Sequence, residues 1–164
     1  MEYRSRCIEK QIERNLKALG AIAIVGPKWS GKTTTAKLFC KSSIEFADPA
    51  DKKRYLGMAD IDIALLLNGD KPRLFDEWQI LPELWDTIRY DVDSNDRTGA
   101  YILTGSNAVD RSEILHSGAG RIVTLKMTTM SLFESGDSDG SISLSGLFGE
   151  SSEIYAESNH TIED

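Results

Sequence analysis

The sequence predicts an α/β fold of three layers, in which helices cover both faces of a parallel sheet of about five strands. Short apolar runs rich in β-branched residues alternate with longer amphipathic segments, as strands and crossover helices do. The run at residues 21–25 is apolar at every position, which is typical of a strand buried on both faces. With 164 residues, 40% hydrophobic and 27% charged, the chain is long enough for a domain with a buried core.

The first half of the chain alternates helix and strand patterns. In order, the expected elements are a helix at 8–19, a strand at 21–25, a helix at 32–41, a strand at 44–47 and a helix at 59–67. The leading helix is predicted because Ile8, Ile12, Leu16 and Leu19 recur at helical spacing. Gly20, Asp48-Pro49 and Asn68-Gly69 are stop or turn signals at the ends of these elements.

The second half continues the alternation. The expected elements are a strand at 73–76, a helix at 81–90, a strand at 100–104, a helix at 108–115 and a strand at 121–125. Pro82 is compatible with its helix because the first turn needs no amide donor there. Ser131 and Glu134 have the spacing of a capping box, which predicts one more helical turn.

The net charge of -7 comes from the end of the chain. Residues 131–164 carry eight acidic residues and no Lys or Arg, so residues 1–130 hold 19 basic and 18 acidic groups. We therefore expect one domain over residues 1–149, followed by an acidic tail of flexible composition over 150–164. The near-neutral body lacks the basic excess of a domain that binds nucleic acid by itself.

Other classes of protein are also disfavoured by the sequence. No apolar run has transmembrane length, and the charged N-terminus lacks the apolar core of a secretion signal. The two cysteines, Cys7 and Cys40, have no Cys or His partners at metal-ligand spacing. We expect a cytoplasmic protein with reduced cysteines, no zinc site and no membrane partner.

A phosphate-binding loop is predicted between the first strand and the helix that follows it. Residues 26–33 fit the pattern G-x-x-x-x-G-K-[ST], whose glycines let backbone amides face a phosphate while the lysine adds a positive charge. The predicted nucleotide-binding residues are Gly26, Pro27, Lys28, Trp29, Ser30, Gly31, Lys32, Thr33 and Thr34. The expected ligand is ATP, and the hydroxyl of Thr33 is suited to Mg²⁺.

Two acids end the strand at 73–76. Asp76 is the type of residue that holds Mg²⁺ in such proteins, and Glu77 could orient the water that attacks the γ-phosphorus. On their own, these acids could equally be a solvated strand end before a helix. Glu77 favours hydrolysis over transfer to an acceptor, as does the lack of an arginine-rich lid, since Arg111 is the lone arginine between Arg97 and Arg121.

A run of small polar residues closes the strand at 100–104. Thr104, Ser106 or Asn107 could hold the attacking water, although Gly-Ser-Asn is also ordinary turn chemistry. Arg121, after the glycine turn at 118–120, could sense the phosphate charge, but an arginine before a strand is more often a solvated cation. Lys32, Glu77, Ser106, Asn107 and Arg121 are thus the candidate catalytic residues.

Several of these motifs, in this order, resemble a family of prokaryotic AAA-like ATPases that carry a C-terminal domain of unknown function. The resemblance covers roughly residues 3–150, and its motifs lie at 26–34, 72–79, 102–106, 116–121 and 130–136. It implies a P-loop NTPase fold with the strand at 100–104 between the two motif strands. It also implies ATP and Mg²⁺ binding at the first two motifs, a sensor-like role for the third, and functional weight for Arg121.

The sequence departs from this family at two points. The chain stops within its acidic tail, so it looks truncated before the second domain, and Thr128-Thr129 stand where the family has arginine and proline. The expected activity is Mg-dependent hydrolysis of ATP to ADP and phosphate. The alternatives are an interaction module that binds nucleotide with negligible turnover and, third, a small-molecule kinase. The oligomeric state, a protein partner and the biological process stay open.

Overall fold

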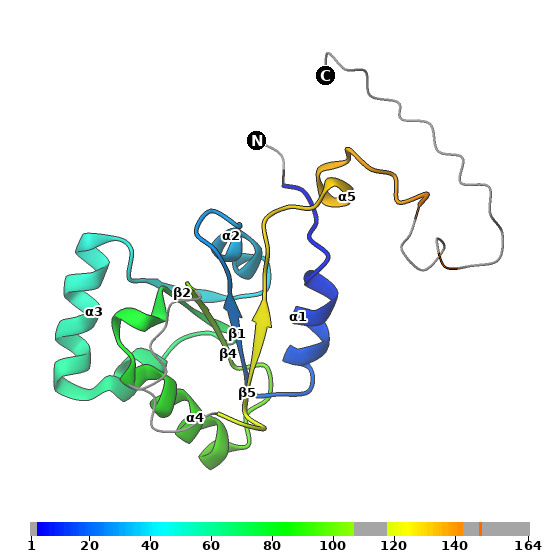
Figure 1. The fold of residues 1–164 in the computed structure, drawn as a ribbon. Coiled ribbons are helices and arrows are strands. Elements are labelled where there is room, and N and C mark those ends of the chain that lie inside the picture. The colour runs from blue at the N-terminus through cyan, green and yellow to red at the C-terminus, as the bar shows by residue number, and fades with distance from the viewer. Residues whose placement is uncertain (1–2, 107–117, 143–147, 149–164) are drawn as a thin grey trace. The chain divides into compact units, whose positions relative to one another are not determined.

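The structure is a computed structural model that describes residues 3–106, 118–142 and 148 (Figure 1). The chain divides into two compact units, of which the larger is Cys7–Thr129. The smaller combines Met1–Arg6 with Met130–Asp164. The predicted boundary after residue 149 lies outside the described residues and stays a prediction.

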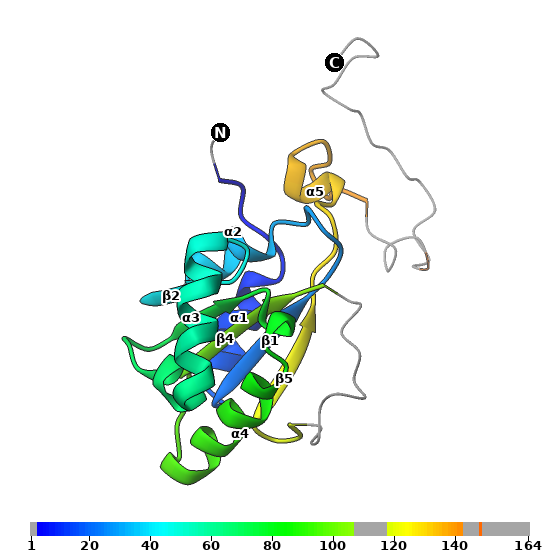
Figure 2. The same ribbon diagram turned by 90° about the vertical axis from the view of Figure 1, so that its left-hand side faces the viewer.

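The larger unit is built on a five-stranded parallel sheet, in the order β2-β3-β4-β1-β5. Figure 2 shows β4, β1 and β5 running side by side. The strands are β1 (Ala21–Val25), β2 (Ser42–Glu45), β3 (Arg73–Asp76), β4 (Tyr101–Gly105) and β5 (Ile122–Lys126). The predicted α/β fold and its parallel sheet are confirmed, and β4 lies between β1 and β3, as the family resemblance implied.

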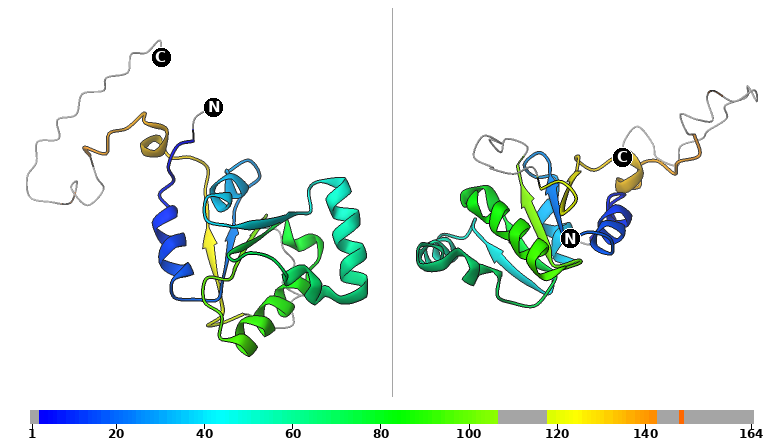
Figure 3. Two further views of the ribbon diagram at one scale, coloured as in Figure 1. Left: turned by 180° about the vertical axis from the view of Figure 1, so that it is seen from behind. Right: turned by 90° about the horizontal axis from the view of Figure 1, so that it is seen from below.

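Helices cover both faces of this sheet (Figure 3). Alternate side chains of each strand point to opposite faces, so each face has its own core. On one face, Ile22 and Ile24 of β1 pack in a core with residues of α1 (Glu9–Leu16) and α2 (Lys32–Lys37). On the other face, Ala21 and Ala23 join the core of α4 (Glu83–Asn95).

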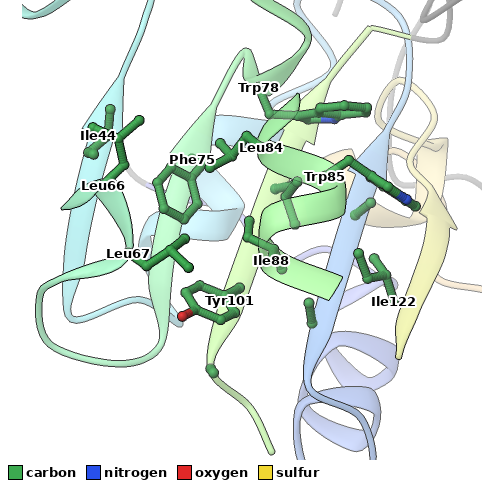
Figure 4. Close-up of a cluster of buried hydrophobic side chains, with 14 of the residues drawn as sticks. Ile44, Leu66, Leu67, Phe75, Trp78, Leu84, Trp85, Ile88, Tyr101 and Ile122 are labelled. Carbon is green, nitrogen blue, oxygen red and sulfur yellow. The ribbon is translucent and has the colours of Figure 1, made fainter. Parts of the chain in front are cut away.

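This second core holds the larger aromatic side chains (Figure 4). Phe75 of β3 and Tyr101 of β4 contribute rings from the sheet, whose centroids lie 6.1 Å apart. Trp78 of η2 (Trp78–Ile80) and Trp85 of α4 have ring centroids 5.1 Å apart. Leu66 and Leu67 add the short helix η1 (Ile63–Leu67) to the same cluster. The packing fixes η2, and with it the residues that follow β3.

Helix α3 (Pro49–Asp62) begins well before the helix that the sequence pattern predicted. It is followed by η1, whereas a helix was expected only over 59–67. Asp48 caps α3 by accepting hydrogen bonds from the amides of Ala50 and Asp51, at 2.8 and 3.2 Å. No residue of α3 is buried, so no apolar stripe marks it in the sequence.

The smaller unit contains α5 (Leu132–Ser135), which confirms the predicted helical turn. Its capping box is complete, because the Ser131 amide donates to Glu134 Oε2 and the Ser131 hydroxyl accepts from the Glu134 amide. Arg6 Nε lies 3.1 Å from Glu134 Oε1, and both side chains are buried. The helix expected at 108–115 lies outside the described residues. In the part of the chain that is described, no helix is long and apolar enough to span a membrane.

Candidate functional site

The candidate site lies at the carboxyl edge of the sheet, where parallel strands all end. The loop of residues 26–31 follows β1, Glu77 follows β3, and Ser106 follows β4. Because β4 is hydrogen-bonded to both β1 and β3, these three strand ends are neighbours. The sheet therefore brings together three of the motifs that the sequence singled out.

The loop after β1 depends on both of its glycines. A Cβ on Gly26 would overlap the backbone carbonyl oxygen of Met127, which follows β5. Gly31 has φ of +90°, in the left-handed region that a residue with a side chain adopts only with strain. Trp29 also lies there, with φ of +69°, and its side chain is 93% exposed. The backbone of the loop thus packs closely against Met127 at Gly26, whereas the loop is exposed to solvent at Trp29.

Lys32 lies over this loop rather than in solvent. Its side chain is buried, and Nζ donates to the carbonyl oxygens of Gly26 at 3.1 Å and Pro27 at 2.8 Å. A buried ammonium group needs such acceptors, since an unpaired buried charge is costly. Its charge is therefore held beside the backbone of the loop, where a phosphate would need it.

Asp76 joins the loop to two strands. Thr33 Oγ1 donates to Asp76 Oδ1 at 2.7 Å, and Thr104 Oγ1 of β4 donates to the same oxygen. Asp76 is 5% exposed and Thr104 is fully buried. A carboxylate and a hydroxyl at this distance are ligands of the type that Mg²⁺ takes. The structure thus brings together Thr33 and Asp76, which the sequence proposed as metal ligands, and ties Thr104 to Asp76.

Glu77 has an unusual backbone and a partner that the sequence analysis missed. Its φ is +56°, so the chain leaves β3 through a left-handed residue that is not glycine. Gln79 Nε2 donates a hydrogen bond to Glu77 Oε2. The only sequence signal for this contact was a polar residue two positions after Glu77, which by itself is too common to assign a role.

The other candidate residues are placed differently. Ser106 follows β4 directly and is half-buried at the same edge, whereas Asn107 lies outside the described residues. The Arg121 carbonyl accepts from the Ala21 amide at 3.0 Å, so Arg121 is level with the start of β1, and its side chain pairs with Asp93. The structure does not bring Arg121 to the loop of its own chain, because it lies at the amino edge of the sheet.

Comparison with known proteins gives one family. The sequence model of a family described as an AAA domain matches residues 19–135, which include β1 with its loop, β3 with its two acids, and β4. No curated protein matches the chain.

Proposed function

The chain belongs to the AAA domain family, whose members have nucleotide-binding ATPase-type activity, and from this we propose that it binds ATP with Mg²⁺ and hydrolyses it to ADP and phosphate. Within this proposal, residues 1–149 form the ATPase domain and residues 150–164 an acidic tail. The observation that carries the proposal is the hydrogen bond of Thr33 to Asp76, which joins the phosphate loop to the acid of β3.

The nucleotide phosphates would lie against the predicted nucleotide-binding residues 26–34, which are the loop of residues 26–31 and the first residues of α2. Their backbone amides would bind phosphate oxygens, and Lys32, now bound to the carbonyls of Gly26 and Pro27, would add the positive charge. Thr33 and Asp76 would hold Mg²⁺, which neutralises charge on the β- and γ-phosphate oxygens when it is bound. The chemistry of these side chains fits that ion.

Glu77 is the proposed catalytic residue for the water. Hydrolysis forms a bond from the water oxygen to the γ-phosphorus and breaks the bond to the oxygen between the β- and γ-phosphates. Glu77 would accept a hydrogen bond from this water and orient it. Ser106 and Asn107 would contact the γ-phosphate from the end of β4. Arg121 has no part in the proposal for this chain's own loop, because its side chain pairs with Asp93 at the opposite edge.

The test compares wild type with Lys32→Ala and Glu77→Gln, measuring ATP affinity and phosphate release separately. We expect Lys32→Ala to lose ATP binding, because it removes the charge from the loop. Glu77→Gln should still bind ATP but release phosphate about a hundredfold more slowly, the lower end of what one positioned proton acceptor typically contributes. If wild type bound ATP yet released no more phosphate than Glu77→Gln, hydrolysis would be disproved and the chain would be a nucleotide-binding interaction module.

A further inference from the structure

We propose that Gln79 is a positioning residue, which holds the carboxylate of Glu77 in the orientation that hydrolysis needs and occupies space that Gly105 leaves free. The inference rests on the proposed function, since it concerns the water-orienting acid of that reaction. Gln79 lies within the motif at 72–79, but neither the resemblance nor the family match gives this residue a role of its own.

The contact with Glu77 sets the direction of the Gln79 amide. Its Nε2 donates to Glu77 Oε2, and only the amide nitrogen can donate to a carboxylate, so the orientation of the amide is fixed by chemistry. The other end, Oε1, therefore points away from Glu77. It lies beside Gly105, where a Cβ would stand 2.5 Å from it.

Packing alone does not account for a glutamine at position 79. Among the residues that the structure describes, no donor reaches the buried Oε1 of Gln79. A buried carbonyl oxygen without a donor is unfavourable, so an apolar side chain of the same length would be more stable at this position. What glutamine adds over that side chain is the hydrogen bond to Glu77.

Neighbouring elements hold Gln79 in place. It lies in η2, between Trp78, which is 2% exposed, and Ile80, and the Trp78 ring packs against Trp85 (Figure 4). The end of β4 closes the other side, where a Cβ on Gly105 would lie 3.2 Å from Trp78 Nε1. Gln79 is therefore fixed by η2, to which it belongs, and by the end of β4, while its amide is hydrogen-bonded to Glu77.

Gly105 then gives an independent way to disturb the contact. Gly105 does not have a positive φ, so alanine is compatible with the backbone at this position. The added methyl group would meet Gln79 Oε1 and, less severely, the indole of Trp78. Gly105→Ala should thus displace the glutamine without removing any polar group from the site.

The consequence for turnover follows from how sensitive the reaction is to geometry. A displacement of about 1 Å in a reacting group can lower a rate about a hundredfold. Glu77 has a flexible side chain, and Gln79 donates a hydrogen bond to it at the end of β3. Loss of this partner should lower kcat while the phosphate loop, which binds ATP, is unchanged.

The experiment measures kcat, the Kd for ATP and the melting temperature of Gln79→Met and Gly105→Ala. Methionine keeps the length of the side chain but carries neither the donor nor the unsatisfied acceptor. We expect kcat to fall about tenfold to a hundredfold in both variants. The Kd for ATP should stay within about twofold, and the melting temperature of Gln79→Met should equal or exceed that of wild type.

Two comparisons make the outcome specific. Gln11→Met changes the exposed glutamine of α1 in the same way, and it should leave all of the measured quantities unchanged. In the Gln79→Met background, Gly105→Ala should lower kcat little further, because the contact that it disturbs is already absent.

Three results would overturn the inference. Wild-type kcat in Gln79→Met would show that the hydrogen bond has no role in turnover. A fall in kcat matched by a fall in melting temperature or in ATP affinity would assign Gln79 to packing instead. Wild-type phosphate release no faster than that of Glu77→Gln would overturn the proposed function itself, and the inference with it, which distinguishes that failure from the first two.

Discussion

Asp76 is the residue at which three parts of the fold converge. It ends β3, and it accepts hydrogen bonds from Thr33 of the loop region and from Thr104 of β4. A buried carboxylate requires such donors, because a charge without partners is strongly disfavoured away from water. The two threonines therefore stabilise the fold at the same point where they would define a metal site.

Thr104→Val tests this dual role. The substitution keeps the shape of a fully buried side chain but removes the hydroxyl that donates to Asp76. Hydrogen bonds to charged groups contribute about 1.5–3 kcal/mol, so we expect the free energy of unfolding to fall by about that amount. Urea denaturation measures it, with Thr124→Val on the exposed side of β5 as the control. Equal stability of the two variants would contradict the role assigned to this hydroxyl.

The residues of the site differ in how far the sequence could predict them. The loop follows from spacing, because a phosphate imposes a fixed order of residues on one continuous segment. The pair Asp76-Glu77 follows from its place at the end of an apolar strand downstream of that loop. The bond of Thr104 to Asp76 joins residues of different strands, so no local pattern contains it. The position of Arg121 could have been predicted from the sequence. Arg121 precedes a strand, and parallel strands begin at the edge of the sheet opposite to the one that carries the loops following them.

At the scale of elements, strands were predicted better than helices. Strands β1 and β3 have the expected bounds, and β4 and β5 each begin and end one residue later than expected. A strand that is buried on both faces is a continuous apolar run, so it can be recognised in the sequence. Helix α3 buries no residue, so only its cap, Asp48-Pro49, could have indicated where it begins.

The end of α4 gives a prediction at this scale. Asp96 follows the helix with φ of +46°, a left-handed conformation that suits glycine better than any residue with a side chain. Its negative charge also lies at the negative end of the helix dipole. We therefore expect Asp96→Gly to raise the free energy of unfolding by about 0.5–1 kcal/mol.

A second substitution separates the two causes. Asp96→Asn removes the charge but keeps a side chain that tolerates the left-handed region, so its stability should lie between those of wild type and Asp96→Gly. Thermal unfolding of the three proteins gives the order. If Asp96→Asn were as stable as Asp96→Gly, backbone conformation would contribute nothing at this position.

At the scale of the whole molecule, alternation of strands and helices predicts a parallel sheet but not the order of its strands. The family resemblance implied only that the strand at 100–104 lies between the two motif strands. That position matters because β4 between β1 and β3 brings Thr104 and Gly105 to the site. Periodicity is a property of each segment alone, whereas strand order depends on which surfaces pack together. Sequence patterns therefore predicted the layers, and the side-chain contacts at the site required the structure.

A lysine just before β3 makes the stability of the whole domain depend on pH. Lys71 precedes β3, and its ammonium group lies 3.8 Å from the centre of the Tyr101 ring and donates to the Leu67 carbonyl. The pKa of Lys71 is lowered from 10.5 to about 8, chiefly by burial, against which Asp91 acts and to which Arg97 and Arg73 add. The folded protein therefore releases this proton more readily than the unfolded chain does.

The sign of the effect follows from proton counts. Between pH 8 and 10.5 the unfolded chain keeps the Lys71 proton and the folded protein loses it. The unfolded state then binds more protons, so this group makes the free energy of unfolding rise with pH across that window. Burial raises the pKa values of Cys40 and Tyr101, and these groups act in the opposite sense above pH 9 and pH 10 respectively.

Lys71→Met isolates the contribution of the lysine, because the substitution leaves Cys40 and Tyr101 in place. We expect the difference in unfolding free energy between the variant and wild type to be largest below pH 8, where the fold must bury a charged amine, and to narrow steadily towards pH 9.5. Urea denaturation at half-unit steps from pH 7 to 9.5 measures this difference. A difference that stayed constant across the range would mean that Lys71 titrates in the folded protein as it does in the unfolded chain.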